Sequence, residues 1–261
     1  MNYGHFLDLP FDDYKAIKAI NFSGMKELAR SGAHYQAYLK RPNEITDARI
    51  IGTGVHAAVL EPEKFASTVV SIAGHRGSKD VKAAVEAATL AGKFVVKPEQ
   101  YETINRMAAS VLAKSKRMNL FVGGVAESTI FVKDPATEAE MKARPDYLDV
   151  DRGVIFDLKT FSNAAEPAFR RQLYNMRYDW QSGFYLRAVG LHFGSGITDF
   201  VNVVVEDDEP YSVNVIRVDD PTIERATEVI YDLLAKYAKY SKEEVWPDYD
   251  DQVVSCNIDL L

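Results

Sequence analysis

Asp146, Asp157 and Lys159 lie within one short segment, Arg144–Thr160, whose pattern is that of two strands and a turn. Apolar and polar residues alternate on either side of Asp151-Arg152-Gly153, as in a β-hairpin. Because side chains alternate between the faces of a strand, Asp157 and Lys159 should point to one face. If the hairpin brings Asp146 opposite them, two carboxylates and an ammonium meet. Such oxygen-rich clusters hold Mg²⁺ or Mn²⁺, and these ions support attack on phosphodiesters.

Other polar residues suited to chemistry lie outside this segment. His56 stands in an otherwise apolar stretch, Gly52–Leu60, and a neutral imidazole is a common ligand of divalent cations. Glu127 lies on the strand predicted before the hairpin, and it would face the cluster if that strand borders the hairpin. Gln181 and Tyr185 are one helical turn apart, so they share a face of a predicted helix. An amide and a phenol there would orient a substrate phosphate or the metal ligands.

Each of these residues has a structural alternative. Asp157 and Lys159 can form a solvated ion pair on an exposed strand, since the motif is short and both residue types are common. His56 can be a hydrogen-bonded residue of the core, and Glu127 an exposed residue of a strand. The spacing of the amide and the phenol indicates little by itself. The chemistry therefore depends on whether the fold brings these side chains together.

The composition limits the class of protein. A chain of 261 residues, 47% hydrophobic and 26% charged, is long enough for one large soluble domain. No apolar run is long enough to span a membrane, and no basic segment leads into an apolar one as in a signal peptide. The one cysteine, Cys256, excludes an intrachain disulfide and a four-cysteine metal site, which indicates a reducing cytoplasm. A net charge of −7 argues against nonspecific binding of nucleic acid but allows a local basic track.

Hydrophobic periodicity and helix-ending residues predict a helical first half and a mixed second half. Ser23 is the expected N-cap of the first helix. Helices are expected over residues 21–39, 47–60, 79–91, 99–116, 166–174, 180–191 and 221–240. Besides the hairpin, strands are expected over residues 125–132, 198–205 and 211–218. This order predicts an α/β fold with a mixed sheet flanked by helices, preceded by a helical region of the same unit.

In their order along the chain, these residues resemble the motifs of PD-(D/E)XK nucleases of the RecB type. The corresponding motifs are Gly52-x-x-x-His56, Glu127, Pro145-Asp146, Asp157-Leu158-Lys159 and Gln181-x-x-x-Tyr185. The closer resemblance is to the RecE (exodeoxyribonuclease VIII) nucleases and their phage relatives. It extends over nearly the whole chain, including residues 21–26, 31–39, 54–65, 142–146 and 245–247. The second acidic position is Asp157 rather than Glu, a shorter side chain that the family tolerates, and no expected ligand is missing.

The resemblance implies a restriction-endonuclease-like core with a mixed central sheet flanked by helices. It implies one nuclease domain over residues 1–261, with residues 1–122 mainly helical and residues 123–261 forming the sheet-bearing catalytic core. One Mg²⁺, replaceable by Mn²⁺, would be bound by Asp146, Asp157, the backbone carbonyl of Leu158 and His56. Glu127 would assist a second ion. Lys159 would hold or deprotonate the attacking water, and Gln181 and Tyr185 would support the catalytic groups.

The implied activity is that of a 5′→3′ exonuclease on linear double-stranded DNA, which leaves 3′ single strands for a recombinase or annealing protein. The resemblance also implies a ring-shaped homo-oligomer around DNA, such as a tetramer, and a strand-annealing partner of the RecT type. The setting would be phage or prophage recombination in a bacterial cytoplasm. Two alternatives remain: a RecB-type nuclease acting on single strands or cutting internally, and a non-catalytic DNA-end-binding accessory protein.

Residues that contact DNA are less clearly marked. Arg76, Lys79 and Lys82 flank an expected loop that would follow a phosphate backbone. Ser23 and Lys26, at an expected helix N-terminus, would receive a terminal phosphate. The alternative for each of these residues is ordinary surface solvation.

Overall fold

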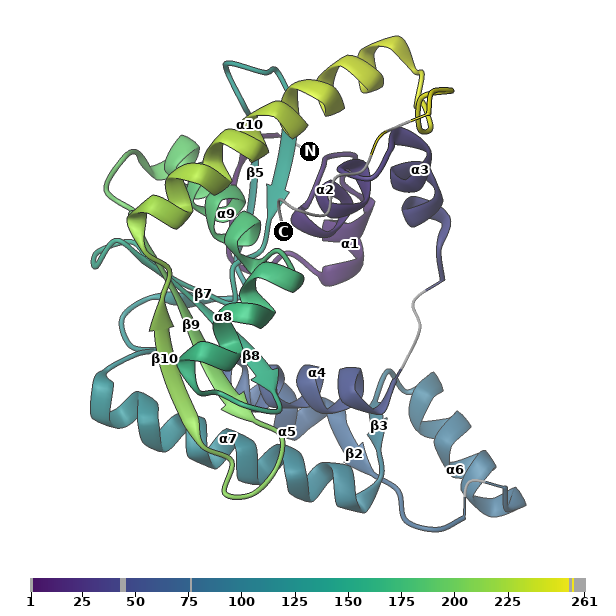
Figure 1. The fold of residues 1–261 in the computed structure, drawn as a ribbon. Coiled ribbons are helices and arrows are strands. Elements are labelled where there is room, and N and C mark those ends of the chain that lie inside the picture. Colours follow the sequence, from purple (N-terminus) through teal and green to yellow (C-terminus); the bar gives the residue numbers. More distant parts are fainter. Residues whose placement is uncertain (1, 43–45, 76, 254, 256–261) are drawn as a thin grey trace.

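The computed structural model describes residues 2–42, 46–75, 77–253 and 255, and it shows an α/β fold built on a mixed sheet (Figure 1). The strands of this sheet lie in the spatial order β10 (Val213–Arg217), β9 (Asp199–Glu206), β8 (Val154–Phe161), β7 (Tyr147–Asp149) and β4 (Val125–Ala126). β8 and β9 are parallel, and the other neighbouring pairs are antiparallel. The predicted mixed sheet is therefore confirmed, and β8, which carries Asp157 and Lys159, lies at its centre.

Helices cover both faces of this sheet (Figure 1). One face carries α8 (Glu166–Asn175), α9 (Tyr178–Phe193) and α10 (Asp220–Glu243), and the other carries α4 (Asp47–Leu60) and α7 (Pro98–Met118). Alternate residues of β8 follow this division. Ile155 belongs to the same core cluster as Phe184 of α9, whereas Phe156 and Leu158 belong to the cluster that contains Val55 of α4. Since both faces are buried, a charged side chain on β8 must find its partners inside the protein.

A second, antiparallel sheet has the order β1 (Gly4–Phe6), β5 (Thr129–Lys133) and β6 (Glu140–Ala143). The chain passes between the two sheets at Glu127, after β4, and again between β6 and β7. The two crossings lie side by side, because the Glu127 N–H donates a hydrogen bond to the Asp146 carbonyl at 3.0 Å. Glu127 has a left-handed backbone with φ of 50°, which divides the single strand predicted over residues 125–132 into β4 and β5.

The remaining elements belong to the first half of the chain: α1 (Phe11–Ala16), α2 (Phe22–Leu28), α3 (Gly32–Lys40), α5 (Pro62–Thr68), β2 (Val69–Ser71), α6 (Lys79–Leu90) and β3 (Phe94–Val96). α2 packs on α9 and α10, whereas α5, β2, β3 and α6 extend beyond α4 (Figure 1). Because β1 pairs with β5 and α4 packs on β8, we propose that the chain forms one domain, mainly helical up to residue 122.

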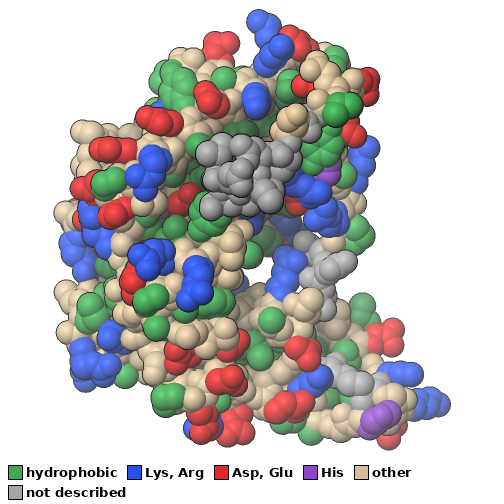
Figure 2. Space-filling model, viewed as in Figure 1, with side chains coloured by type: hydrophobic (Ala, Val, Ile, Leu, Met, Phe, Trp, Pro, Cys, Tyr) green, Lys and Arg blue, Asp and Glu red, His purple; other side chains and the backbone are tan. Residues whose placement is uncertain are grey.

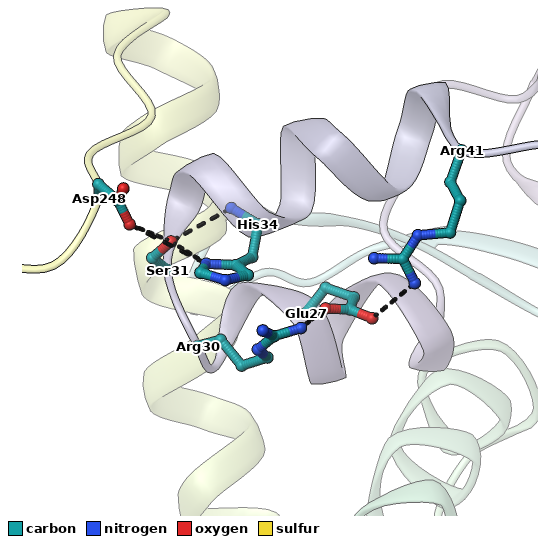
Figure 3. A network of polar contacts seen from close by, with 6 residues as sticks. All are labelled: Glu27, Arg30, Ser31, His34, Arg41 and Asp248. Atoms are coloured by element: carbon teal, nitrogen blue, oxygen red, sulfur yellow. Dashed lines mark hydrogen bonds and ion pairs between the residues drawn. The ribbon is translucent and has the colours of Figure 1, made fainter.

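The single helix predicted over residues 21–39 is wrong, because the chain forms α2 and α3 with a break between them. Ser31 accounts for the break: its hydroxyl accepts a hydrogen bond from the His34 N–H at 3.2 Å and donates to Asp248 at 3.1 Å (Figure 3). Such a side chain caps a new helix rather than continuing the old one. The predicted N-cap is also wrong, since Asn21 and not Ser23 accepts the Gly24 N–H, at 2.9 Å.

Among the described residues, no helix is both long enough and apolar enough to cross a membrane.

Candidate active site

Asp146 lies opposite Asp157 at the open end of the β7–β8 hairpin. Tyr147 pairs with Phe156 in the antiparallel register, and one step further Asp146 Oδ2 accepts the Leu158 backbone N–H at 2.7 Å. At the closed end, Gly153 has φ of 69°, a conformation that L side chains rarely adopt, and a Cβ there would collide with the Gly196 carbonyl. The hairpin predicted from alternation and the turn glycine is therefore confirmed.

His56, Glu127 and Asp146 form a cluster whose ligand atoms all lie within 4.8 Å of one another. α4 supplies His56, whereas the two carboxylates come from the adjacent crossings between the sheets. His56 Nδ1 lies 3.5 Å from Asp146 Oδ2, and the imidazole is 29% exposed, while the preceding Val55 is fully buried. The alternative of a core histidine is therefore wrong, because His56 faces the carboxylates rather than the apolar core.

The positive charge beside this cluster is too small to keep both carboxylates ionised at neutral pH. Burial raises the pKa of Glu127 to about 8, and the negative charge of Asp146 adds to the shift. Arg144 opposes it, with its Nε 3.8 Å from Glu127 Oε2. One imidazole nitrogen and two carboxylates make a donor set that suits Mg²⁺ or Mn²⁺, and a divalent cation would supply the missing charge. The side chains present therefore fit a metal centre.

Asp157 and Lys159 form a buried ion pair on the face of β8 that α9 covers; the Asp157 side chain is 1% exposed. Gln181 of α9 bridges the pair, since its Nε2 donates to Asp157 Oδ1 at 2.8 Å and its Oε1 accepts from Lys159 Nζ at 3.0 Å. The alternative of a solvated surface pair is therefore wrong. An amide that contacts both charges fixes their relative orientation, which a solvated pair would not have.

The two charges of this pair shift each other's protonation. Burial raises the pKa of Asp157 to about 6, although the charge of Lys159 lowers it in part. Burial alone would lower the pKa of Lys159, but the charges of Asp157 and Asp146 outweigh that effect and raise it. Lys159 is consequently a fixed cation beside the cluster. Strongly shifted carboxyl groups next to a held cation are typical of catalytic sites.

A cavity of about 870 Å³ opens beside the carboxylates, and Glu127, Asp146 and Tyr185 line part of it. Its other lining residues include the cationic side chains Lys15, Lys26, Arg41, Arg49, Lys142 and Arg144. The surface is hollowed between α1–α3 and α4, and Lys and Arg side chains border the hollow (Figure 2). A cavity with cationic walls beside a cluster of carboxylates suits a polyanionic ligand whose phosphate approaches a bound metal ion.

The family described as a PDDEXK-like domain of unknown function (DUF3799) matches residues 21–258. The chain belongs to this family. The matched region contains His56, Glu127, the β7–β8 hairpin and Gln181, so it includes every group of the candidate site. The PD-(D/E)XK assignment made from the motifs is confirmed, and the narrower resemblance to RecE stays a prediction.

A solved structure shows the same fold. A candidate exonuclease from Eubacterium rectale superposes with a TM-score of 0.66 at 16% sequence identity, over 97% of each chain. SSO0001 has a TM-score of 0.33 at 11% identity, over 91% of this chain and 96% of its own. LHK-Exo in complex with dAMP has a TM-score of 0.25 at 16% identity, over 76% of this chain and 95% of its own. The last two scores are too low to carry an argument. No curated protein matches the sequence.

The residues assigned to metal binding and catalysis lie in two adjoining groups, His56 with Glu127 and Asp146, and Asp157 with Lys159 and Gln181. Direct binding of a cation by Asp157 stays a prediction. Asp157 takes part through Lys159 and Gln181 rather than through direct contact with His56. The Leu158 backbone joins Asp146 through its N–H, and a role for its carbonyl stays a prediction. Tyr185 lines the cavity, and burial raises its pKa well above the ordinary value.

The residues assigned to DNA contact divide into two groups. Ser23 and Lys26 line the cavity, and burial together with the charge of Lys159 lowers the pKa of Lys26. Lys79 and Lys82 are exposed on α6 and are not among the residues that line the cavity, so their contact with a phosphate backbone stays a prediction. Arg76, like Cys256, lies outside the described residues.

Three residues of the site had no role in the sequence interpretation. Arg144 donates from Nε to the Glu127 carbonyl at 2.9 Å. Its position directly before Pro145-Asp146 could have indicated a role in the site. The Tyr178 ring lies 4.4 Å from Lys159 Nζ, one turn before Gln181 on α9. Asn202 is fully buried in register with Asp157, and its amide has no hydrogen-bond partner among the described residues. A lone polar residue in an apolar strand was its signal.

The raised pKa of Glu127 predicts how metal binding depends on pH. Between its ordinary pKa of 4.5 and about 8, the folded protein holds a proton that the unfolded chain has lost, so metal-free stability falls as pH rises through this window. Since a cation binds the ionised carboxylate, binding releases that proton below about pH 8. We expect the dissociation constant for Mn²⁺ to fall about tenfold between about pH 6.5 and about pH 8, as measured by calorimetry.

The matched variant is Glu127→Gln, which keeps the shape of the side chain and removes the titrating group. It should bind Mn²⁺ more weakly and with a much flatter pH profile. A pH profile as steep as that of the wild type would show that another group titrates.

Proposed function

We propose that this protein is a Mg²⁺-dependent deoxyribonuclease, and more narrowly a 5′→3′ exonuclease on linear double-stranded DNA. The observation that supports this most is the buried Lys159, held by Asp157 and Gln181 beside the His56, Glu127 and Asp146 cluster. A solvated or structural ion pair would need neither the adjoining metal ligands nor the cation-lined cavity. Membership of the PDDEXK-like family supports the same chemistry.

The side chains divide the work of phosphodiester hydrolysis. Asp146, Glu127 and His56 would hold the divalent cation, with Asp157 and the Leu158 carbonyl completing its sphere. When bound, the cation neutralises the phosphate and lowers the pKa of an attacking water. Lys159 would donate a hydrogen bond to that water or to a phosphoryl oxygen, where negative charge grows in the transition state. Gln181 would keep the ammonium aimed at the reaction centre, and Tyr185 would face the substrate in the cavity.

The biological setting follows from the resemblance to RecE nucleases. The product would be a 3′ single-stranded tail, used by an annealing protein of the RecT type in phage or prophage recombination in a bacterial cytoplasm. A ring-shaped homo-oligomer would keep the enzyme on DNA although the chain carries a net charge of −7. Ser23 and Lys26, which line the cavity, are the proposed contacts to a terminal phosphate.

A linear duplex labelled at its 5′ ends and a covalently closed circle test the activity together, each with Mg²⁺ and with chelator. We expect labelled mononucleotides from the linear DNA, only with Mg²⁺, and an intact circle. The same duplex labelled at its 3′ ends should release label late. The Lys159→Ala variant, purified in the same way, controls for contaminating nucleases.

Other outcomes favour the alternatives. Nicking of the circle would indicate an endonuclease, and degradation of single strands alone a single-strand nuclease. A mobility shift without cleavage under every metal condition would contradict catalysis and indicate a DNA-end-binding protein.

A further inference from the structure

The N-terminal segment, residues 2–20, forms a wall of the cavity although it precedes the family match, which begins at residue 21. Both of its ends are fixed to the second sheet. Gly4–Phe6 pairs with β5, and the Ile20 N–H and carbonyl bond to Glu140 and Lys142 of β6, both at 2.9 Å. The segment between them carries α1 and supplies Phe11, Tyr14, Lys15 and Ala19 to the cavity. It is therefore a strap across one side of the candidate site.

The buried Lys142 and the partly buried Arg144 hold the middle of this strap. The Lys142 ammonium uses all its donors on backbone carbonyls at the end of α1, those of Tyr14, Lys15 and Ile17, at 3.1, 3.0 and 2.7 Å. Arg144 donates to the Leu9 carbonyl and, through Nε, to the carbonyl of Glu127. The Arg144 guanidinium thus links Glu127 of the metal cluster to the strap through one hydrogen bond to each. The position of α1 relative to the cluster is fixed before any ligand binds.

Phe11 is an exposed aromatic side chain of this strap. Its ring is 57% exposed although it lines the cavity, and it lies nearly parallel to the Tyr14 ring, 5.9 Å away at 20°. Lys15 Nζ lies 5.1 Å from the ring centre and the Arg144 guanidinium 5.7 Å from it. An exposed aromatic ring on a rigid support can stack on a base. Lys15 pairs with Asp12 at 2.6 Å, and a phosphate of the stacked strand would compete with that carboxylate for the ammonium.

We infer that Phe11 is a substrate-binding residue that stacks on a nucleobase of the single strand leading to the candidate metal centre. This inference rests on the proposed function and assigns the strap a part in it. Lys142 and Arg144 hold the strap, and the other cations that line the cavity, among them Lys15 and Lys26, favour a polyanion. The exposed ring favours a polymer with flat, unpaired bases. A duplex buries its base faces by stacking, so the strand that Phe11 contacts is unpaired at that nucleotide.

The test measures binding of a fluorescent oligothymidine by anisotropy, with every substitution made in the inactive Lys159→Ala protein. Phe11→Ala should raise the dissociation constant about 5- to 150-fold, the equivalent of the ~1–3 kcal/mol that stacking on one base contributes. Phe11→Trp should bind within about threefold of the parent, since an indole also stacks. Leu7→Ala is the matched control, because Leu7 is 53% exposed on the same segment but does not line the cavity. It should bind like the parent.

Oligonucleotides with one abasic position separate stacking from a structural effect. One abasic position should weaken binding by the parent as much as Phe11→Ala does, and should cost the Phe11→Ala variant little more. The inference would be overturned if an abasic position weakened binding equally wherever it stood, in the parent and in the Phe11→Ala variant alike. An unchanged dissociation constant for Phe11→Ala would also overturn it. If Phe11 proves unimportant but the wild type cleaves DNA, the proposed nuclease function stands and the inference about Phe11 is wrong. If the Lys159→Ala parent binds no nucleic acid, the proposed function and the inference about Phe11 are both wrong.

Discussion

Replacing Lys159 by alanine is expected to lower the rate of DNA cleavage by roughly 10³-fold or more, the usual effect of removing a group that acts on the transition state. The affinity for Mn²⁺ should be unchanged or tighter, because the lysine is not a ligand and its positive charge opposes a cation beside Asp157. Single-turnover cleavage of a linear duplex and calorimetry with Mn²⁺ measure the two effects separately.

Loss of activity must be distinguished from loss of folding, because Lys159→Ala leaves a buried carboxylate without its partner. The unfolding temperature should therefore be measured with Mn²⁺ present, where the cation replaces the missing charge. Lys133→Ala, an exposed lysine on β5 with 44% of its side chain accessible, is the matched control and should cleave like the wild type. Activity of Lys159→Ala within a few-fold of wild type would remove the lysine from the mechanism.

Replacing Asp146 by asparagine is expected to abolish cleavage while the fold is retained. The amide oxygen of asparagine can still accept a hydrogen bond from the Leu158 N–H. The hairpin therefore keeps this contact at the end away from its turn. One negative charge of the metal cluster is lost, and we expect the affinity for Mn²⁺ to fall by at least about tenfold to 100-fold. Without Asp146 the pKa of Glu127 should move down toward its ordinary value, since the charge of Asp146 is one cause of its shift.

The measurements are calorimetry with Mn²⁺, cleavage of linear duplex, and thermal unfolding in chelator. In chelator the variant should be at least as stable as the wild type, because losing the Asp146 charge brings the pKa of Glu127 closer to its value in the unfolded chain. Asp151→Asn, an exposed carboxylate in the turn of the same hairpin, should change none of the three quantities. Unchanged Mn²⁺ affinity in Asp146→Asn would contradict the metal centre.

Local patterns were enough to find the catalytic hairpin. The alternation around Gly153 specified two strands and a turn, and an antiparallel register then brought Asp146 opposite Asp157. The helix predicted over residues 47–60 agrees with α4 because its apolar period is regular and it ends before Pro62. The prediction of one helix over residues 21–39 was wrong because the apolar period continues through Ser31 without a visible break. The Ser31 hydroxyl caps a new helix there and binds Asp248, far away in the sequence.

The residue types that could bind a cation and activate water were readable from the sequence, since their order along the chain matches one family of folds. Which of them meet depends on the folding of distant segments against each other. Glu127 joins the cluster through a left-handed backbone at a crossing between two sheets, and Gln181 fixes Lys159 from a helix that covers the strand. The strap is positioned by Lys142 and Arg144 through backbone carbonyls, which every residue offers. Contacts of this kind leave no pattern in side-chain types, so they become visible only once the chain is folded.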